Sequence, residues 1–137
     1  MSSTVLQIVN ADRNFSSLVK GLKASDLEET LAGKGPFTIL APINLAFSNL
    51  PAPALDELLK PVNNVKLSDL LSCQILAEKR LYRDFTNGQK VKTINGKEMN
   101  VTVKDGEVRI NGAKILAHDR QGSNGVVHSV DAVSISS

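Results

Sequence analysis

The stretch Thr38-Ile39-Leu40-Ala41-Pro42-Ile43-Asn44-Leu45-Ala46-Phe47 decides the fold of this chain. Residues 37–41 are nearly all apolar, which is typical of a strand that is covered on both faces. Pro42 has no N–H for a sheet ladder and is expected to end the strand. Asn44 is a favourable N-cap for a short helix that follows. Three side chains of that helix are expected to face the core: Leu45, Phe47 and Leu50.

A second informative segment, Ser123-Asn124-Gly125-Val126-Val127-His128-Ser129-Val130-Asp131-Ala132-Val133, lies about 80 residues further along the chain. It predicts a glycine-containing turn followed by a buried last strand over residues 126–135. His128 is a polar side chain within this apolar strand, so it needs a hydrogen-bond partner when it is buried. We expect that partner to be backbone.

The rest of the first half has helical spacing. Apolar residues recur every three or four positions in four places, which predicts helices within residues 5–9, 15–22, 55–59 and 67–75. Ser25 with Glu28 three residues later is a capping box, which predicts a further helix that ends at Gly33 and Gly35.

The second half has the pattern of a β-meander. Four hairpin dipeptides occur at short intervals: Asn87-Gly88, Asn95-Gly96, Asp105-Gly106 and Asn111-Gly112. They separate predicted strands at residues 91–94, 99–103, 108–110 and 115–117. The expected fold is therefore α+β, a single domain over residues 1–137 in which a helical N-terminal half packs on a mainly antiparallel β-meander or sandwich. The strand at residues 37–41 is expected to join the sheet in the middle of the core.

Composition excludes several classes of function. The net charge is +2, the aromatic residues are four Phe, one Tyr and no Trp, and Cys73 is the only cysteine. Residues 77–120 carry ten Lys or Arg and six Asp or Glu, which indicates either a basic face or, more simply, a solvated strand surface. No basic run is dense enough to follow the phosphates of a nucleic acid. No apolar run is long enough to span a bilayer, and no signal peptide is visible.

The two quoted segments resemble the two signature segments of the fasciclin domain, an adhesion module of exported proteins. The first segment matches the family at Thr38, Ala41, Pro42, Asn44, Ala46 and Phe47. The second matches at Asn124, Gly125, His128, Asp131 and Val133. The resemblance covers essentially the whole chain. It implies an extracellular, cell-surface or periplasmic location, although a cytoplasmic one is the alternative for a chain without a visible signal.

The chain departs from the family pattern in three places. Ile43 stands where the family usually has Thr or Ser. The family's Tyr-His, which is linked to integrin binding in animal members, is replaced by Cys73-Gln74. Some animal members carry an adhesive Asp-Ile before the second segment; Asp119 matches the Asp, but Arg120 replaces the Ile.

Catalytic chemistry has no obvious place in the sequence. A metal site could be formed only if His118, Asp119 and His128 converged, and a buried structural role for His128 is the simpler interpretation. Cys73 lies among leucines and is interpreted as a small core residue. No pair of carboxylates lies in an apolar setting. We therefore predict no enzyme activity, no catalytic residue, no metal and no cofactor.

The predicted function is cell adhesion or surface attachment by protein–protein contact. The expected partner is a cell-surface or extracellular-matrix protein, or a second copy of the chain; the alternative is a small-molecule or glycan-binding module. A polar loop over residues 119–124 is the predicted contact site, with Asp119, Arg120 and Gln121 as the binding residues. The remaining signature residues are predicted to be structural: Thr38, Pro42, Asn44, Phe47, Asn124, Gly125, His128 and Asp131.

Overall fold

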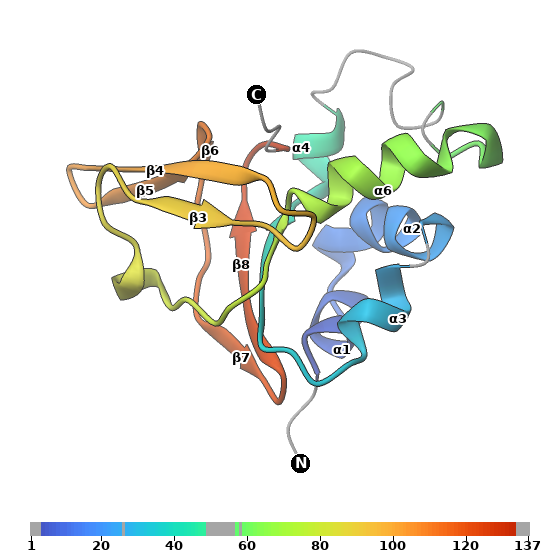
Figure 1. Ribbon diagram of the computed structural model, residues 1–137, viewed down its shortest axis with the longest axis horizontal. Coiled ribbons are helices and arrows are strands. Elements are labelled where there is room, and N and C mark those ends of the chain that lie inside the picture. The colour runs from blue at the N-terminus through green and yellow to red at the C-terminus, as the bar shows by residue number, and fades with distance from the viewer. Residues whose placement is uncertain (1–3, 26, 49–56, 58, 134–137) are drawn as a thin grey trace.

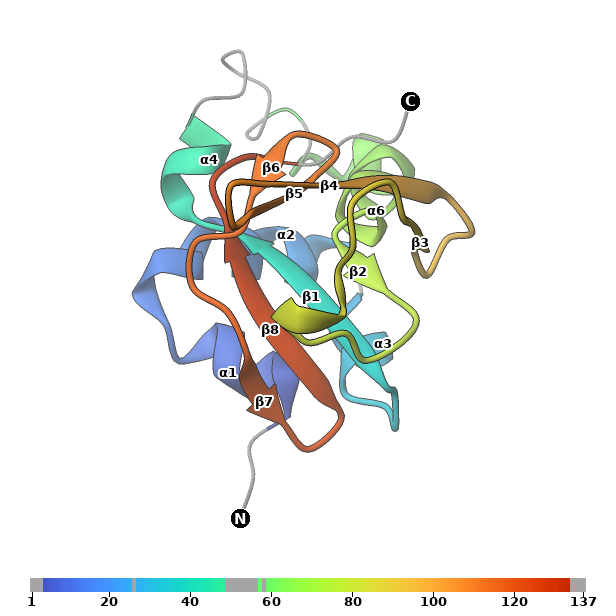
Figure 2. The ribbon, with the colours of Figure 1, turned by 90° about the vertical axis from the view of Figure 1, so that its left-hand side faces the viewer.

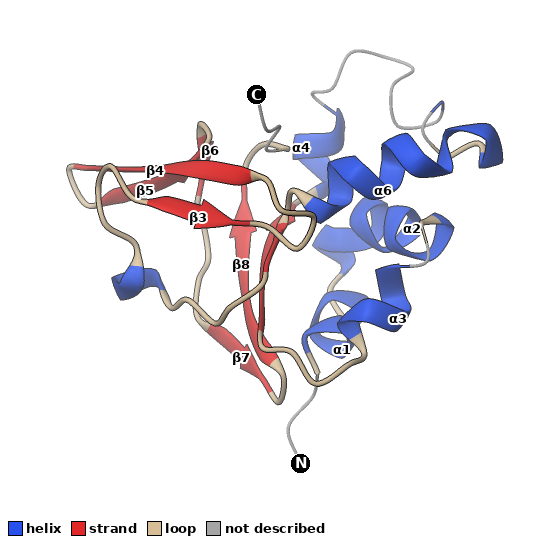
Figure 3. Ribbon diagram, viewed as in Figure 1, coloured by secondary structure: helices blue, strands red, loops and turns tan. Residues whose placement is uncertain are grey.

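The computed structural model describes residues 4–25, 27–48, 57 and 59–133 (Figure 1). The helical elements are α1 (Val5–Asn10), η1 (Arg13–Phe15), α2 (Ser16–Ala24), α3 (Leu27–Leu31), α4 (Asn44–Ser48), η2 (Pro61–Asn63), α6 (Asn64–Ser72) and η3 (Tyr82–Asp84). The strands are β1 (Phe37–Pro42), β2 (Ile75–Leu76), β3 (Lys90–Lys92), β4 (Glu98–Lys104), β5 (Glu107–Ile110), β6 (Ala113–Lys114), β7 (Arg120–Gly122) and β8 (Gly125–Val130). The longer helices gather on one side of the molecule and the strands on the other (Figure 3).

The strands form two sheets. One has the order β2-β1-β8-β7 and the other the order β3-β4-β5-β6. The second sheet is an antiparallel meander. In the first sheet β1 and β8 lie side by side in parallel, from Phe37 opposite Gly125 to Pro42 opposite Val130 (Figure 2). The predicted α+β class is confirmed, and so is the position of the strand at residues 37–41 in the middle of the core.

The β1–β8 pair separates two hydrophobic clusters. Ile39, Ala41 and Val127 belong to the cluster with the helices, whereas Leu40 and Val130 belong to the cluster with the meander. Successive side chains of a strand point to opposite faces, so one strand serves both clusters. This explains why residues 37–41 are apolar at nearly every position instead of at every second position.

The hairpin predictions hold at the β4–β5 and β5–β6 turns of the meander, whereas Asn87-Gly88 precedes β3 and joins no two strands. Asp105 and Gly106 have φ of 53° and 79°, and Asn111 and Gly112 have φ of 48° and 88°. Two positive φ values in succession are the geometry that Asp-Gly and Asn-Gly favour in a two-residue hairpin. The strand predicted at residues 115–117 was misplaced: β6 is Ala113–Lys114. The last strand ends at Val130, five residues earlier than the predicted end, which lies outside the described residues.

The local prediction around Asn44 was wrong. Asn44 is the first residue of α4, and its side chain bonds to a different helix: Oδ1 accepts from the Ser17 N–H (2.9 Å) and Nδ2 donates to the Arg13 carbonyl (2.9 Å). The N-cap position of α2, Phe15, has no capping side-chain oxygen, so Asn44 supplies the cap from a distance in the sequence.

Two further local predictions also need correction. Leu45 is 64% exposed, so only Phe47 of the predicted apolar set is shown in the core; Leu50 lies outside the described residues. Ser25 follows the last residue of α2, and its hydroxyl donates to the Leu22 carbonyl instead of starting the next helix. The helix predicted within residues 55–59 falls mostly outside the described part.

Candidate functional site

Residues 77–84, here called the strap, form the first part of the connection from β2 to β3 and contain the single turn η3. The Thr38 hydroxyl on β1 holds the strap at two points: it donates to the Glu78 carbonyl (2.5 Å) and accepts from the Arg80 N–H (2.8 Å). Thr38 is fully buried. The hydroxyl of this one signature residue therefore acts both as a donor and as an acceptor, and both partners are backbone groups of the strap.

His128 on β8 is fully buried and has a partner on each ring nitrogen. Nδ1 accepts from the Asp119 N–H (3.1 Å), so Nε2 carries the proton and donates to the Arg80 carbonyl (2.7 Å). Burial lowers the pKa of His128, although the Arg80 carbonyl and the Asp119 carboxylate act in the opposite direction. The ring is therefore neutral at neutral pH and holds the strap and Asp119 to the same strand.

In the second signature segment, the side chain of Asn124 also bonds only to backbone groups. The carboxamide of Asn124 accepts from the Val5 N–H (2.9 Å) and donates to the carbonyls of Leu31 (2.7 Å) and Gly33 (2.8 Å). These bonds attach the β7–β8 turn to the first helices. At the next position, Gly125, an added Cβ would lie 2.0 Å from the Phe37 carbonyl oxygen, so only glycine permits this approach of β8 to β1.

The last signature carboxylate also serves the backbone. Asp131 Oδ1 accepts from the Lys114 N–H (2.9 Å), and its own N–H donates to the Lys114 carbonyl (3.1 Å). Ser129 lies two residues before Asp131. Its hydroxyl accepts from the Ala117 N–H and donates to the Ala117 carbonyl. The end of β8 is thus attached to the segment between β6 and β7.

The predicted contact loop is a strand in the structure. Residues 120–122 form β7, which pairs antiparallel with β8 from Arg120 opposite Val127 to Gly122 opposite Gly125. Residues 120–122 have no apolar alternation because β7 lies at the sheet edge and its side chains are exposed or half-buried. Asp119, just before the strand, has a φ of 62°, a conformation that Asp tolerates better than most residues.

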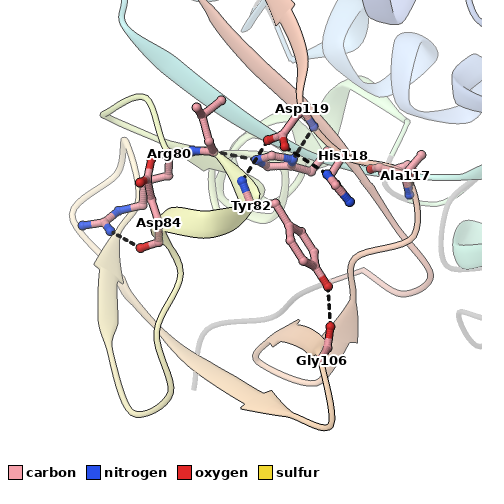
Figure 4. A network of polar contacts seen from close by, with 10 residues as sticks. Arg80, Tyr82, Asp84, Gly106, Ala117, His118 and Asp119 are labelled. Atoms are coloured by element: carbon pink, nitrogen blue, oxygen red, sulfur yellow. Dashed lines mark hydrogen bonds and ion pairs between the residues drawn. The ribbon is translucent and has the colours of Figure 1, made fainter.

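The carboxylate of Asp119 is shared between two partners (Figure 4). Oδ1 accepts from the Tyr82 N–H at 2.8 Å, and Oδ2 lies 3.0 Å from His118 Nδ1. Burial acts to raise the pKa of Asp119, but the bonds from Tyr82 and His118 outweigh it and hold the pKa below its usual value. Asp119 is therefore ionised at neutral pH and joins the strap to β7.

Arg120 and Gln121 make side-chain contacts near the surface. Arg120 Nη1 lies 2.7 Å from Asp12 Oδ2, and Lys79 Nζ donates to Gln121 Oε1 at 2.9 Å. The Asn14 N–H, together with Arg120, lowers the pKa of Asp12 against the effect of burial. These contacts connect β7 to the first helical turns on one side and to the strap on the other.

Tyr82 and His118 complete this part of the surface. Their rings stack with centroids 4.0 Å apart and an interplanar angle of 19°, and the Tyr82 hydroxyl donates to the Gly106 carbonyl (Figure 4). The structure thus gathers a set of neighbouring polar and aromatic side chains, here called the rim: Lys79, Tyr82, His118, Asp119, Arg120 and Gln121. Sequence reasoning missed Lys79 and Tyr82 as members; the signal available was that Tyr82 is the only tyrosine of the chain.

The alternatives that would give the site chemistry are not supported by its geometry. His118, Asp119 and His128 do converge, but both nitrogens of His128 face protein partners, and within the described ranges no group of three or more His, Cys, Asp or Glu could hold a metal. Cys73 and Gln74, which replace the family's Tyr-His, are both buried. Among the basic residues of the second half, Lys79, Arg80 and Arg83 lie on the strap and Lys90 and Lys92 on β3, and Arg80 is paired to Glu78 at 2.8 Å.

No helix in the described part of the chain is both long and apolar enough to cross a membrane.

Comparison with known proteins agrees with this architecture. The chain is 38% identical over 130 residues to Protein sll1483 of Synechocystis, covering 95% of this chain and 72% of that protein. It is 31% identical to the transforming growth factor-beta-induced protein ig-h3 of Oryctolagus cuniculus, covering 96% of this chain but only 19% of that longer protein.

Among solved structures, the chain superposes on a FAS1 domain pair from the insect cell adhesion molecule fasciclin I with a TM-score of 0.84. The identity is 18%, and the match covers 97% of this chain and 51% of that one, so it establishes the fold. The family model of the fasciclin domain matches residues 13–135. The chain therefore belongs to the fasciclin domain family.

Proposed function

We propose that this domain is a non-enzymatic adhesion module that attaches to a partner protein through the rim. Fasciclin domains are modules of cell-adhesion proteins, and the insect domain pair with the same fold comes from a cell adhesion molecule. The proposed partner is a protein at a cell surface or in an extracellular matrix, and the proposed location of the domain is outside the cytoplasm.

The observation that carries the proposal is that the rim combines exposed side chains with a rigid base. Arg120 and Gln121 are exposed, yet their backbone is paired with the fully buried strand β8. Binding residues are concentrated where an ordered scaffold presents exposed groups, because little side-chain or backbone entropy is then lost on binding. Tyr82 and Arg120 are also of the two residue types that often dominate interface energies.

The remaining signature residues support the same assignment by elimination. The side chains of Thr38, Asn124 and His128 are buried and bonded to backbone groups. The helix that carries Cys73 and Gln74 at its end presents neither of them to solvent. The family's integrin-linked position is therefore an unsuitable contact site here, whereas the rim presents charges of both signs.

An attachment assay with a charge-neutralised rim tests the proposal. In the double variant Asp119→Asn with Arg120→Gln, the asparagine keeps an acceptor for the Tyr82 N–H and tolerates the positive φ. We expect attachment to fall about fivefold or more, with an unchanged thermal transition. A contact of this kind should also weaken as the salt concentration rises.

The matched control is Lys92→Gln with Glu98→Gln, which neutralises one acid and one base on the outer side of the meander. These two residues are opposite each other on β3 and β4 and are both exposed. The control should attach as the unaltered protein does. Attachment of the rim variant at the same level as the control would rule out the rim as the contact site.

A further inference from the structure

The strap is held against the first sheet mainly by side chains that reach its backbone. Thr38 bonds to Glu78 and Arg80, His128 to the Arg80 carbonyl, and Asp119 to the Tyr82 N–H. Apart from the single turn η3, the strap has no regular structure of its own. Its position therefore depends on a small number of identified groups, of which His128 is the one whose side-chain type ordinarily changes charge near neutral pH.

The hydrogen bonds of His128 require a neutral ring. Nδ1 must be unprotonated to accept from the Asp119 N–H, while Nε2 must be protonated to donate to the Arg80 carbonyl. A second proton on the ring would sit on Nδ1 and face the Asp119 N–H, so two donors would oppose each other. Protonation thus removes the bond to the residue that also holds Tyr82.

The charged groups around the ring do not remove this conflict. The Asp119 carboxylate favours the charged ring and His118 opposes it, and both precede β7. On the strap, Arg80 is paired with Glu78, and Asp84 accepts from the Leu81 N–H. Thr38 and Leu40 on β1 and Phe85, whose ring meets His128 edge-on at 5.7 Å, do not titrate in this range. Burial outweighs the attraction of Asp119, so the pKa of His128 is lowered.

We propose that His128 is an acid-sensitive latch: the neutral ring holds the strap and Asp119 to β8, and its protonation releases both and dismantles the rim. The effect on attachment rests on the proposed function of the rim. The opening of the strap does not, because it follows from the hydrogen bonds of the fold. The domain would then bind its partner protein at neutral pH and dissociate from it at acidic pH.

The direction of the pH dependence follows from linkage. With the strap closed, the pKa of His128 is lowered from its usual value of about 6.5. When the strap is open, the ring on β8 is exposed to solvent and regains a pKa of about 6.5. The latch is therefore fully effective above about pH 6.5. The opening equilibrium increases about tenfold for each pH unit below 6.5 and levels off once the pH has passed the folded pKa.

Hydrogen exchange followed by NMR between pH 7.5 and 5 tests this directly. The reporter amides are those of Arg80, Tyr82 and Asp119, which donate to Thr38, Asp119 and His128 respectively. After correction for the intrinsic exchange rate, their protection should be constant down to about pH 6.5 and then fall about tenfold per pH unit until the folded pKa of His128 is passed. The amides of Leu40 and Ile43, which donate to the carbonyls of Gln74 and Val130, are the internal control and should keep their protection.

Two variants assign the effect, since the chain has only two histidines. His128→Gln removes the titrating group and should abolish the pH dependence of the three reporter amides, while His118→Gln should retain it. If His128→Gln does not fold, the ring ¹⁵N shifts of the unaltered protein can still assign the pH dependence to His128. They should show His128 protonated on Nε2 alone at pH 7.5, and the ring should titrate at a lower pH than that at which the protection of Asp119 begins to fall.

Reporter amides whose protection does not change down to pH 5 would overturn the latch, as would an unchanged slope in His128→Gln. Attachment measured in parallel separates the two proposals. If the strap opens in acid but attachment is unaffected, the latch stands and the rim is not the contact site.

Discussion

Two sets of polar residues lie on or beside the neighbouring strands β1, β8 and β7 of the first sheet and differ in what they bind. Thr38, Asn124 and His128 are buried, and their partners are backbone groups that are remote in sequence. Arg120 and Gln121, in contrast, are exposed and bond to the side chains of Asp12 and Lys79.

The difference distinguishes an architectural use of polar groups from an interactive one. A buried side chain bonded to backbone is costly to remove, because its partners remain buried without a hydrogen bond. A contact between exposed side chains contributes little to stability, since water replaces either partner. Residues of the first kind should therefore affect folding, and residues of the second kind should affect binding.

The largest effect is expected at Gly125, where the architectural set depends on a close backbone approach. In Gly125→Ala the new Cβ would meet the Phe37 carbonyl oxygen at 2.0 Å, so β1 and β8 would have to separate. We expect a loss of about 3 kcal/mol in the free energy of unfolding by urea. Gly112→Ala is the control: it has open space but a φ of 88°, and the strain alone should cost about 1 kcal/mol. Equal losses in the two variants would contradict the steric argument.

The next effect concerns His128. In His128→Ala the Arg80 carbonyl and the Asp119 N–H both lose their partner, and the expected loss is about 2 kcal/mol at pH 7.5. His118→Ala should stay within about 0.5 kcal/mol, because that side chain is 43% exposed. A thermal transition of His128→Ala that matches the unaltered protein, combined with lost attachment, would move His128 to the interactive set.

A smaller effect is expected at Asn44. In Asn44→Ala the Ser17 N–H in the first turn of α2 loses its acceptor, which should lower the free energy of unfolding by urea by about 1 kcal/mol. Leu45→Ala, a change at the next and 64% exposed position, should be neutral within about 0.5 kcal/mol. If the two variants are equally stable, the cap supplied by Asn44 has no energetic role.

Much of this fold could be predicted from the sequence where a local pattern has a local cause. The Asp-Gly and Asn-Gly dipeptides predicted the turns at Gly106 and Gly112 because these residue types themselves adopt positive φ readily. The apolar run of β1 indicated a strand covered on both faces. His128 could be identified as a residue in need of a partner.

The partners could not be predicted, because they come from distant segments. Nothing local to Asn44 indicates that its carboxamide caps α2 instead of its own helix. Nothing in residues 120–122 indicates a strand, since β7 is defined only by its pairing with β8. For the same reason, the rim contains Lys79 and Tyr82, which are about 40 positions from Arg120 in the chain.

Urea unfolding of Asn124→Ala beside Gln121→Ala tests the distinction most directly, because the two residues are three positions apart on the same hairpin. Asn124→Ala removes the partner of three backbone groups, one at the start of α1 and two at or just after the end of α3, so we predict a loss of about 3 kcal/mol. Gln121→Ala removes one exposed contact with Lys79 and should stay within about 0.5 kcal/mol. Similar losses in the two variants would contradict the division of this hairpin into an architectural and an interactive part.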